Sequence, residues 1–136
     1  MLTRIDHIGI AVANLDATVD FYRTVMGLEV RATEELNGMK IAFLGVGDSE
    51  LELLEDTTLD GAIARFIAKR GEGLQHVAYR VENLEQALAE MRGKGVKLID
   101  ETPRPGARRA RVAFLHPSST KGVLIELVEP HVPLRV

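Results

Sequence analysis

The chain has 136 residues, enough for about one domain with its own buried core. It has no cysteine, which excludes disulfides, thiolate metal sites and a cysteine nucleophile. Hydrophobic residues at 46% and charged residues at 27% exclude disorder, and a net charge of −3 with only 4% aromatic residues excludes a nucleic-acid partner.

The first apolar stretch does not have the properties of a membrane or export segment. Residues 8–13 are too few to span a bilayer, and the acidic Asp6 shortly before them is unlike the basic start of a signal peptide. We therefore expect a cytoplasmic protein without a membrane partner, folded as a single domain of residues 1–136.

An internal repeat organises the chain. The matched pairs are residues 5–16 with 74–85, residues 41–44 with 112–115, and residues 51–55 with 125–129. They occur in the same order, and the offset between them changes only in the segments between, as expected when duplicated units diverge by loop insertion. Two units are too few for a solenoid, so the repeat predicts a duplication within one domain.

The first copy, residues 2–55, predicts the element order βαβββ. A strand at residues 4–12 is followed by Asn14, a good N-cap, and by a helix that ends before Gly27. The apolar positions of this helix are Leu15, Val19, Tyr22, Val25 and Met26. The three later strands are expected at residues 28–33, 39–44 and 50–54.

A linker helix at residues 59–70 separates the copies, because Leu59, Ile63 and Phe66 fall at helical spacing. The second copy, residues 73–130, repeats the order: a strand at residues 74–81, a helix capped by Asn83, and strands at residues 96–99, 111–115 and 122–128. The fold class is therefore α+β, with two βαβββ modules that form a curved mixed sheet.

Four residues stand at equivalent places in the two copies: His7 and His76 on the first strands, and Glu52 and Glu126 on the last strands. Apolar neighbours flank each glutamate, so each carboxylate points away from the core that those neighbours enter. A carboxylate in a sheet concavity needs a cation or a proton. Two imidazoles and two carboxylates suit a divalent ion such as Co²⁺, Mn²⁺, Ni²⁺, Fe²⁺ or Zn²⁺.

The alternative interpretation is that these histidines and glutamates bind no metal. A lone histidine on a strand is more often a structural residue than a ligand, and a glutamate between apolar residues usually marks the solvent face of a strand. The repeat favours the metal site because it matches histidine with histidine and glutamate with glutamate. His116, followed by a proline, is expected to be a structural turn residue, and His131 to be solvated.

Longer stretches of the chain resemble the methylmalonyl-CoA epimerase family of the vicinal oxygen chelate, or glyoxalase-like, superfamily. The resemblance rests on residues 5–12, on residues 63–73 leading into residues 75–78, and on residues 114–118 and 121–127, and it covers residues 2–130. The family usually has a doubled histidine where this chain has Gln75 and His76. It usually has a lysine where this chain has Ser118.

The resemblance implies that His7, Glu52, His76 and Glu126 hold a divalent metal and that the substrate is an acyl-CoA. The reaction would be epimerisation of (2R)- and (2S)-methylmalonyl-CoA through removal of the α-proton and stabilisation of the enolate. It implies a homodimer as well. A loop with Arg104, Arg108 and Arg109, together with Lys121, is a candidate for the CoA phosphates, and a solvated loop is the alternative.

The chain departs from part of the family at one catalytic position. Some members carry an additional glutamate on the strand that corresponds to residues 39–44, and this segment has no carboxylate here. Glu126 is therefore expected to be one acid/base group, with Glu52 or a metal-bound water as candidates for the other. Two other functions remain open: a glyoxalase I-type lyase acting on a glutathione hemithioacetal, and a non-catalytic protein that binds a small molecule.

Overall fold

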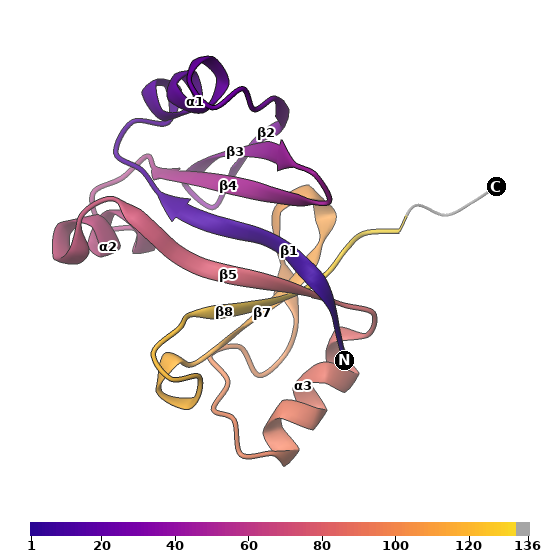
Figure 1. The fold of residues 1–136 in the computed structure, drawn as a ribbon. Coiled ribbons are helices and arrows are strands. Elements are labelled where there is room, and N and C mark those ends of the chain that lie inside the picture. The colour runs from indigo at the N-terminus through magenta and orange to yellow at the C-terminus, as the bar shows by residue number, and fades with distance from the viewer. Residues whose placement is uncertain (133–136) are drawn as a thin grey trace. The chain divides into compact units, whose positions relative to one another are not determined.

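The structure is a computed structural model that describes residues 1–132. Its strands are β1 (Leu2–Ala11), β2 (Val30–Leu36), β3 (Met39–Val46), β4 (Ser49–Asp56), β5 (Gly73–Val81), β6 (Arg104–Pro105), β7 (Arg111–Leu115) and β8 (Ile125–Glu129). Its helices are α1 (Leu15–Thr24), α2 (Ala62–Arg70) and α3 (Leu84–Gly93), with short 3-10 turns at Ala107–Arg109 and Pro117–Ser119. The predicted βαβββ order occurs twice, so the fold class is confirmed (Figure 1).

Contacts divide the chain into two compact units, which are described separately. One contains residues 7–76, and its hydrogen-bonded strands follow the order β2-β3-β4-β1. The other contains residues 1–6 and the chain from residue 77 onward, with the order β5-β8-β7-β6. In each unit the first and last strands of the module, β1 with β4 and β5 with β8, pair in parallel, while the remaining pairs are antiparallel.

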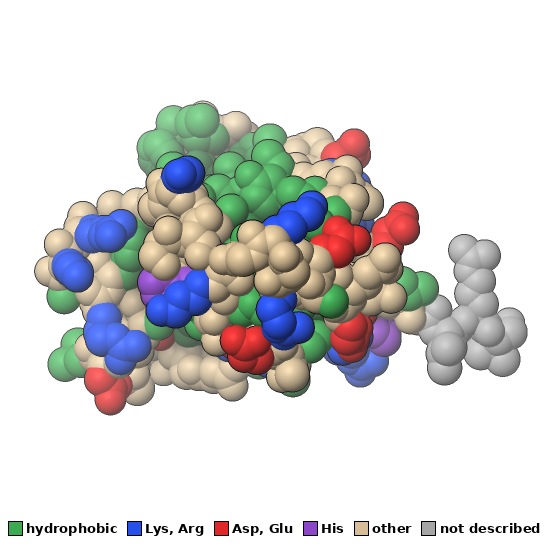
Figure 2. Space-filling view, turned by 90° about the horizontal axis from the view of Figure 1, so that it is seen from below, with side chains coloured by type: hydrophobic (Ala, Val, Ile, Leu, Met, Phe, Trp, Pro, Cys, Tyr) green, Lys and Arg blue, Asp and Glu red, His purple; other side chains and the backbone are tan. Residues whose placement is uncertain are grey.

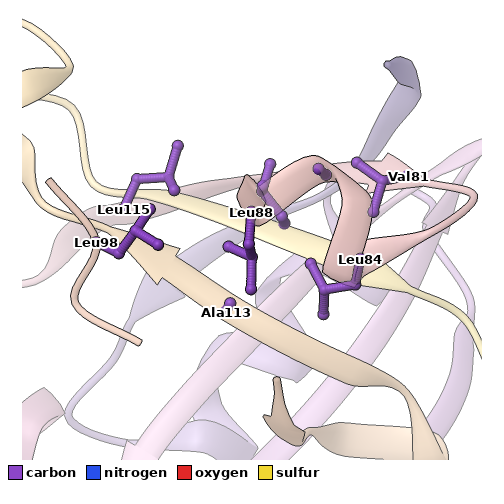
Figure 3. Close-up of a cluster of buried hydrophobic side chains, with 8 residues drawn as sticks. Val81, Leu84, Leu88, Leu98, Ala113 and Leu115 are labelled. Carbon is purple, nitrogen blue, oxygen red and sulfur yellow. The ribbon is translucent and has the colours of Figure 1, made fainter. Parts of the chain in front are cut away.

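Each module buries one face of its strands beneath its own helix. Figure 1 shows α1 lying over the strands of its module. The core beneath α1 consists of Val12, Leu15, Ala42, Leu44 and Leu53. In the other module α3 packs on the cluster drawn in Figure 3, which contains Val81, Leu84, Ala87, Leu88, Leu98, Ala113, Leu115 and Leu127. The opposite face of the strands is therefore left for other side chains.

The two modules start their helices with the same set of hydrogen bonds. The Asn14 side chain accepts from the Ala17 amide at 3.0 Å, and Asn83 accepts from the Gln86 amide at 3.0 Å. A glutamate from the last strand of each module adds a second bond: Glu55 accepts from the Leu15 amide, and Glu129 from the Leu84 amide. The duplication thus extends to the amides that a helix N-terminus leaves without intrahelical partners.

Three sequence expectations were wrong. Residues 96–99 do not form a strand: Leu98 makes an isolated bridge to Leu115, and the Asp100 carboxylate accepts the Phe114 amide proton that a strand carbonyl would have taken. Leu59 is 98% exposed, because α2 begins only at Ala62. Val25 and Met26 are exposed, because α1 ends at Thr24.

The surface carries both signs of charge. On the face seen in Figure 2, basic and acidic side chains are interspersed. Arg111 links Glu85 on α3 to Glu129 on β8, and its hydrogen bond to Glu85 lowers the pKa of that carboxyl group. Because Glu85 and Arg111 lie in solvent, this link adds little to stability. Within residues 1–132 no helix combines the length and apolar character that crossing a membrane requires.

We predict that Asn14→Ala and Asn83→Ala each lower the free energy of unfolding by about 1 kcal/mol, since each removes one N-cap hydrogen bond. Urea denaturation followed by circular dichroism measures this. Asn14→Ser and Asn83→Ser, which keep an acceptor oxygen, serve as controls and should lose less. Equal stability of the alanine variants and the parent protein would contradict the capping role.

Candidate metal centre

Three of the four residues singled out in the sequence come together in the unit of residues 7–76. His7 lies on β1, Glu52 on β4 and His76 on β5, and each is at most 7% exposed. The two imidazole Nε2 atoms are 3.1 Å apart. Glu52 Oε1 lies 3.4 Å from His7 Nε2 and 3.5 Å from His76 Nε2. Three electron-rich atoms therefore face one another in a buried position.

Strand alternation sends these side chains away from α1. On β4, Leu53 enters the core beneath α1, so Glu52 projects from the opposite face. Glu52 is the partner of Gly9 in the parallel pairing of β1 with β4, and Gly9 lies two residues beyond His7 on the same face of β1. A Cβ atom at Gly9 would lie 2.1 Å from the His76 ring, so the glycine makes room for that imidazole.

Neighbouring side chains orient the two imidazoles. The side-chain oxygen Oε1 of Gln75 lies within hydrogen-bond distance of His76 Nδ1. An amide oxygen at this position would accept from Nδ1–H, and in that tautomer Nε2 is the ring atom that can act as a metal ligand. The Phe43 ring meets the His7 ring edge to face, with centroids 6.1 Å apart. Sequence reasoning missed these roles of Gln75 and Gly9, since it treated Gln75 only as a departure from a family pattern.

The donor set fits a divalent ion. Bonds of about 2.1 Å to an ion separate neighbouring ligand atoms by about 3.0 Å in octahedral and about 3.4 Å in tetrahedral coordination. The three distances of 3.1, 3.4 and 3.5 Å lie within about 0.1 Å of that range. Two nitrogens and one carboxylate oxygen are the donor types that borderline divalent metals prefer. His7, Glu52 and His76 could therefore hold a divalent metal ion.

The fourth residue, Glu126, belongs to the other compact unit. It lies on β8, is 7% exposed, and pairs with Ala78 of β5 and Phe114 of β7. Its register repeats that of Glu52. Glu52 is opposite the residue two positions after His7, and Glu126 is opposite the residue two positions after His76. The pairing in each module thus assigns the two glutamates equivalent places.

The remaining sequence candidates have structural or surface roles. His116 Nδ1 accepts from the Ser118 amide and caps a 3-10 turn, so the expected structural role is confirmed. Arg104 pairs with Asp100 and stacks on the Phe114 ring. The exposed His131 lines a cavity of about 410 Å³, and Arg109 lines the same cavity.

Comparison with known proteins agrees with this fold and site. Residues 6–114 match the model of the Glyoxalase/Bleomycin resistance protein/Dioxygenase superfamily, and the chain belongs to that superfamily. An uncharacterised protein of Bacillus subtilis, YqjC, is 40% identical over 131 residues, covering 95% of this chain and 94% of that protein. The mitochondrial methylmalonyl-CoA epimerase of Bos taurus is 35% identical over 129 residues, covering 93% of this chain and 74% of that protein.

A solved structure extends the comparison. A variant of Streptomyces coelicolor methylmalonyl-CoA epimerase in complex with 2-nitronate-propionyl-CoA matches with a TM-score of 0.92 and 44% identity, covering 97% of this chain and 100% of the other. The resemblance expected from the sequence is therefore confirmed. A lactoylglutathione lyase of Escherichia coli, which represents the alternative lyase function, is only 27% identical over 128 residues.

We predict that Gly9→Ala weakens the binding of Co²⁺ by about tenfold or more, because the added methyl group displaces the His76 imidazole. Isothermal titration calorimetry measures the affinity. Gly93→Ala, at a position where a Cβ atom meets nothing within 4 Å, is the matched control and should bind Co²⁺ as the parent does. An unchanged affinity of the Gly9 variant would show that the ring is not a ligand.

Proposed function

We propose that this protein is an epimerase that interconverts (2R)- and (2S)-methylmalonyl-CoA with the help of a divalent metal ion. The observation that carries the proposal is the buried His7–Glu52–His76 cluster with the ligand spacing of a divalent ion. It occurs in a chain that is 44% identical, over nearly its whole length, to an epimerase bound to an acyl-CoA analogue. The lower similarity to a lactoylglutathione lyase makes that activity the weaker candidate.

The proposed ligands are His7, Glu52, His76 and Glu126. The first three are supported by their mutual distances, and Glu126 is supported by its burial and by the register that it shares with Glu52. Co²⁺, Mn²⁺, Ni²⁺, Fe²⁺ and Zn²⁺ all suit imidazole and carboxylate donors. A bound divalent ion supplies positive charge that stabilises negative charge on the thioester and carboxylate oxygens of the substrate.

The chain itself must remove and return a proton. Epimerisation breaks the C–H bond at carbon 2 of the methylmalonyl group and forms a new C–H bond on the opposite face, so no other reactant is consumed. We assign one of the two acid/base roles to Glu126 and keep Glu52 as the candidate for the other. Strand β3 offers no carboxylate: its residue Ile41 is buried and apolar.

Two further properties belong to the proposal. We expect a homodimer, as the family resemblance implies, and sedimentation equilibrium would show it. The cytoplasmic location stays a prediction from the sequence.

The reaction is tested by incubating the metal-loaded protein with (2R)-methylmalonyl-CoA in deuterated water. We expect deuterium at carbon 2 and appearance of the 2S epimer, loss of both after chelation, and recovery when a divalent metal is added. Mass spectrometry and a stereospecific coupled assay measure the two products. Absence of deuterium would refute the epimerase. Turnover of the glutathione hemithioacetal instead would support a lyase, and binding without either reaction would support a non-catalytic role.

We predict that Glu126→Gln keeps the fold but slows exchange at carbon 2 by about a hundredfold or more, because the amide cannot take the α-proton. Circular dichroism checks the fold, and the deuterium assay checks exchange. Glu90→Gln, an exposed glutamate on α3, removes the same charge and should exchange at the parental rate. Parental exchange in the Glu126 variant would remove this residue from the mechanism.

A further inference from the structure

An arginine is held in a fixed position in the unit that contains the candidate metal centre. Arg31 lies on β2 where the pairing with β3 shifts by one residue, a β-bulge of the kind that re-aims a side chain. Its guanidinium donates from Nη2 to the Gly47 carbonyl at 3.0 Å and lies 3.5 Å from Glu50 Oε2 through Nη1. The side chain is nevertheless 46% exposed.

A glycine creates the place for this guanidinium. A Cβ atom at Gly45 would lie 2.2 Å from Arg31 Nε, so any larger residue at position 45 displaces the arginine. Gly45 lies two residues from Phe43 on β3, and both therefore face the same side of the strand. The Phe43 ring meets the His7 ring, so the guanidinium lies on the face of the sheet that carries the metal-site residues.

Arg31 pairs with a glutamate on the face of the sheet that carries the metal-site residues. Glu50 is the strand partner of His7 and lies two residues from Glu52 on the same face of β4. Its side chain is 11% exposed, and Arg31 is an ion-pair partner of its carboxylate. A guanidinium has five N–H donors, and the two contacts described use only Nη1 and Nη2. Arg31 thus keeps donors for a further oxygen anion in the geometry that arginine provides for carboxylate and phosphate.

We propose that Arg31 is a substrate-binding residue that takes an anionic oxygen group of the acyl-CoA. This inference rests on the proposed function and adds a specific recognition group to it. The substrate offers that chemistry in two places, the free carboxylate of its acyl group and the phosphates of its CoA portion. Both are oxygen anions that the exposed part of the guanidinium can bind.

Calorimetric titration of the metal-loaded protein with three compounds tests the proposal: methylmalonyl-CoA, CoA, and methylmalonyl-pantetheine, which has the carboxylate but no phosphate. We expect Arg31→Met to weaken the binding of methylmalonyl-CoA by about tenfold to a hundredfold, since a charged hydrogen bond is lost. Arg23→Met, on the solvent side of α1, removes the same charge and should bind as the parent does.

The other two compounds identify the source of the anion. If Arg31 binds the carboxylate, Arg31→Met lowers the affinity for methylmalonyl-pantetheine and leaves the affinity for CoA unchanged. If Arg31 binds a phosphate, the variant lowers the affinity for CoA and leaves the affinity for methylmalonyl-pantetheine unchanged. Either pattern supports the proposal, and parental affinity for all three compounds overturns it.

A merely structural role of Arg31, as the partner of Glu50, is tested separately. The double variant Arg31→Met/Glu50→Gln removes both charges, so no carboxylate is left without its cation. We expect its affinity for methylmalonyl-CoA to stay as low as that of Arg31→Met, and recovery to the parental affinity would overturn the proposal. Gly45→Ala keeps the arginine but displaces it, and should weaken binding without altering Co²⁺ affinity.

Failure of this inference is distinguishable from failure of the proposed function. A parent protein that incorporates deuterium into methylmalonyl-CoA, with an Arg31→Met variant that binds like Arg23→Met, refutes only the role of Arg31. A parent protein that neither binds nor exchanges methylmalonyl-CoA refutes the epimerase and the role of Arg31 together.

Discussion

The structure depends on three electron-rich atoms that are buried within 3.5 Å of one another: two imidazole nitrogens and a carboxylate oxygen. Burying three such atoms together is favourable when a proton or a cation lies between them. A proton shared by the two nitrogens would serve one of these contacts, whereas a cation could be bound by all three donors at once. Gly9, Gln75 and Phe43 all act to keep the two imidazoles turned toward this point.

Much of the fold could be predicted because it is encoded locally and repeated. Asn14 and Asn83 mark the helix starts with short-range hydrogen bonds, and alternation along β4 separates Leu53 from Glu52. The strand expected at residues 96–99 failed for a tertiary reason. Asp100 supplies a side-chain acceptor to β7, which no local propensity reveals.

The candidate site was only partly visible in the sequence. His7, Glu52 and His76 were found because the repeat marked them, without any knowledge of their distances. The sequence did not reveal the glycines that make room for functional side chains. The role of a glycine such as Gly9 or Gly45 becomes visible only when the structure shows which side chain packs against it. Arg31 was overlooked for the same reason, because only the bulge in β2 and the gap at Gly45 direct it to the site face.

Strand β4 has an apolar face toward α1 and a face that carries glutamates, so its pairing register affects both the core and the candidate site. A slip of one residue in the pairing of β4 would turn Glu50 and Glu52 beneath α1 and bring Leu51 and Leu53 out to the other side. Such a misaligned chain would lose its core and its ligand set in the same event. The register of β4 therefore decides the packing beneath α1 and the position of Glu52 together.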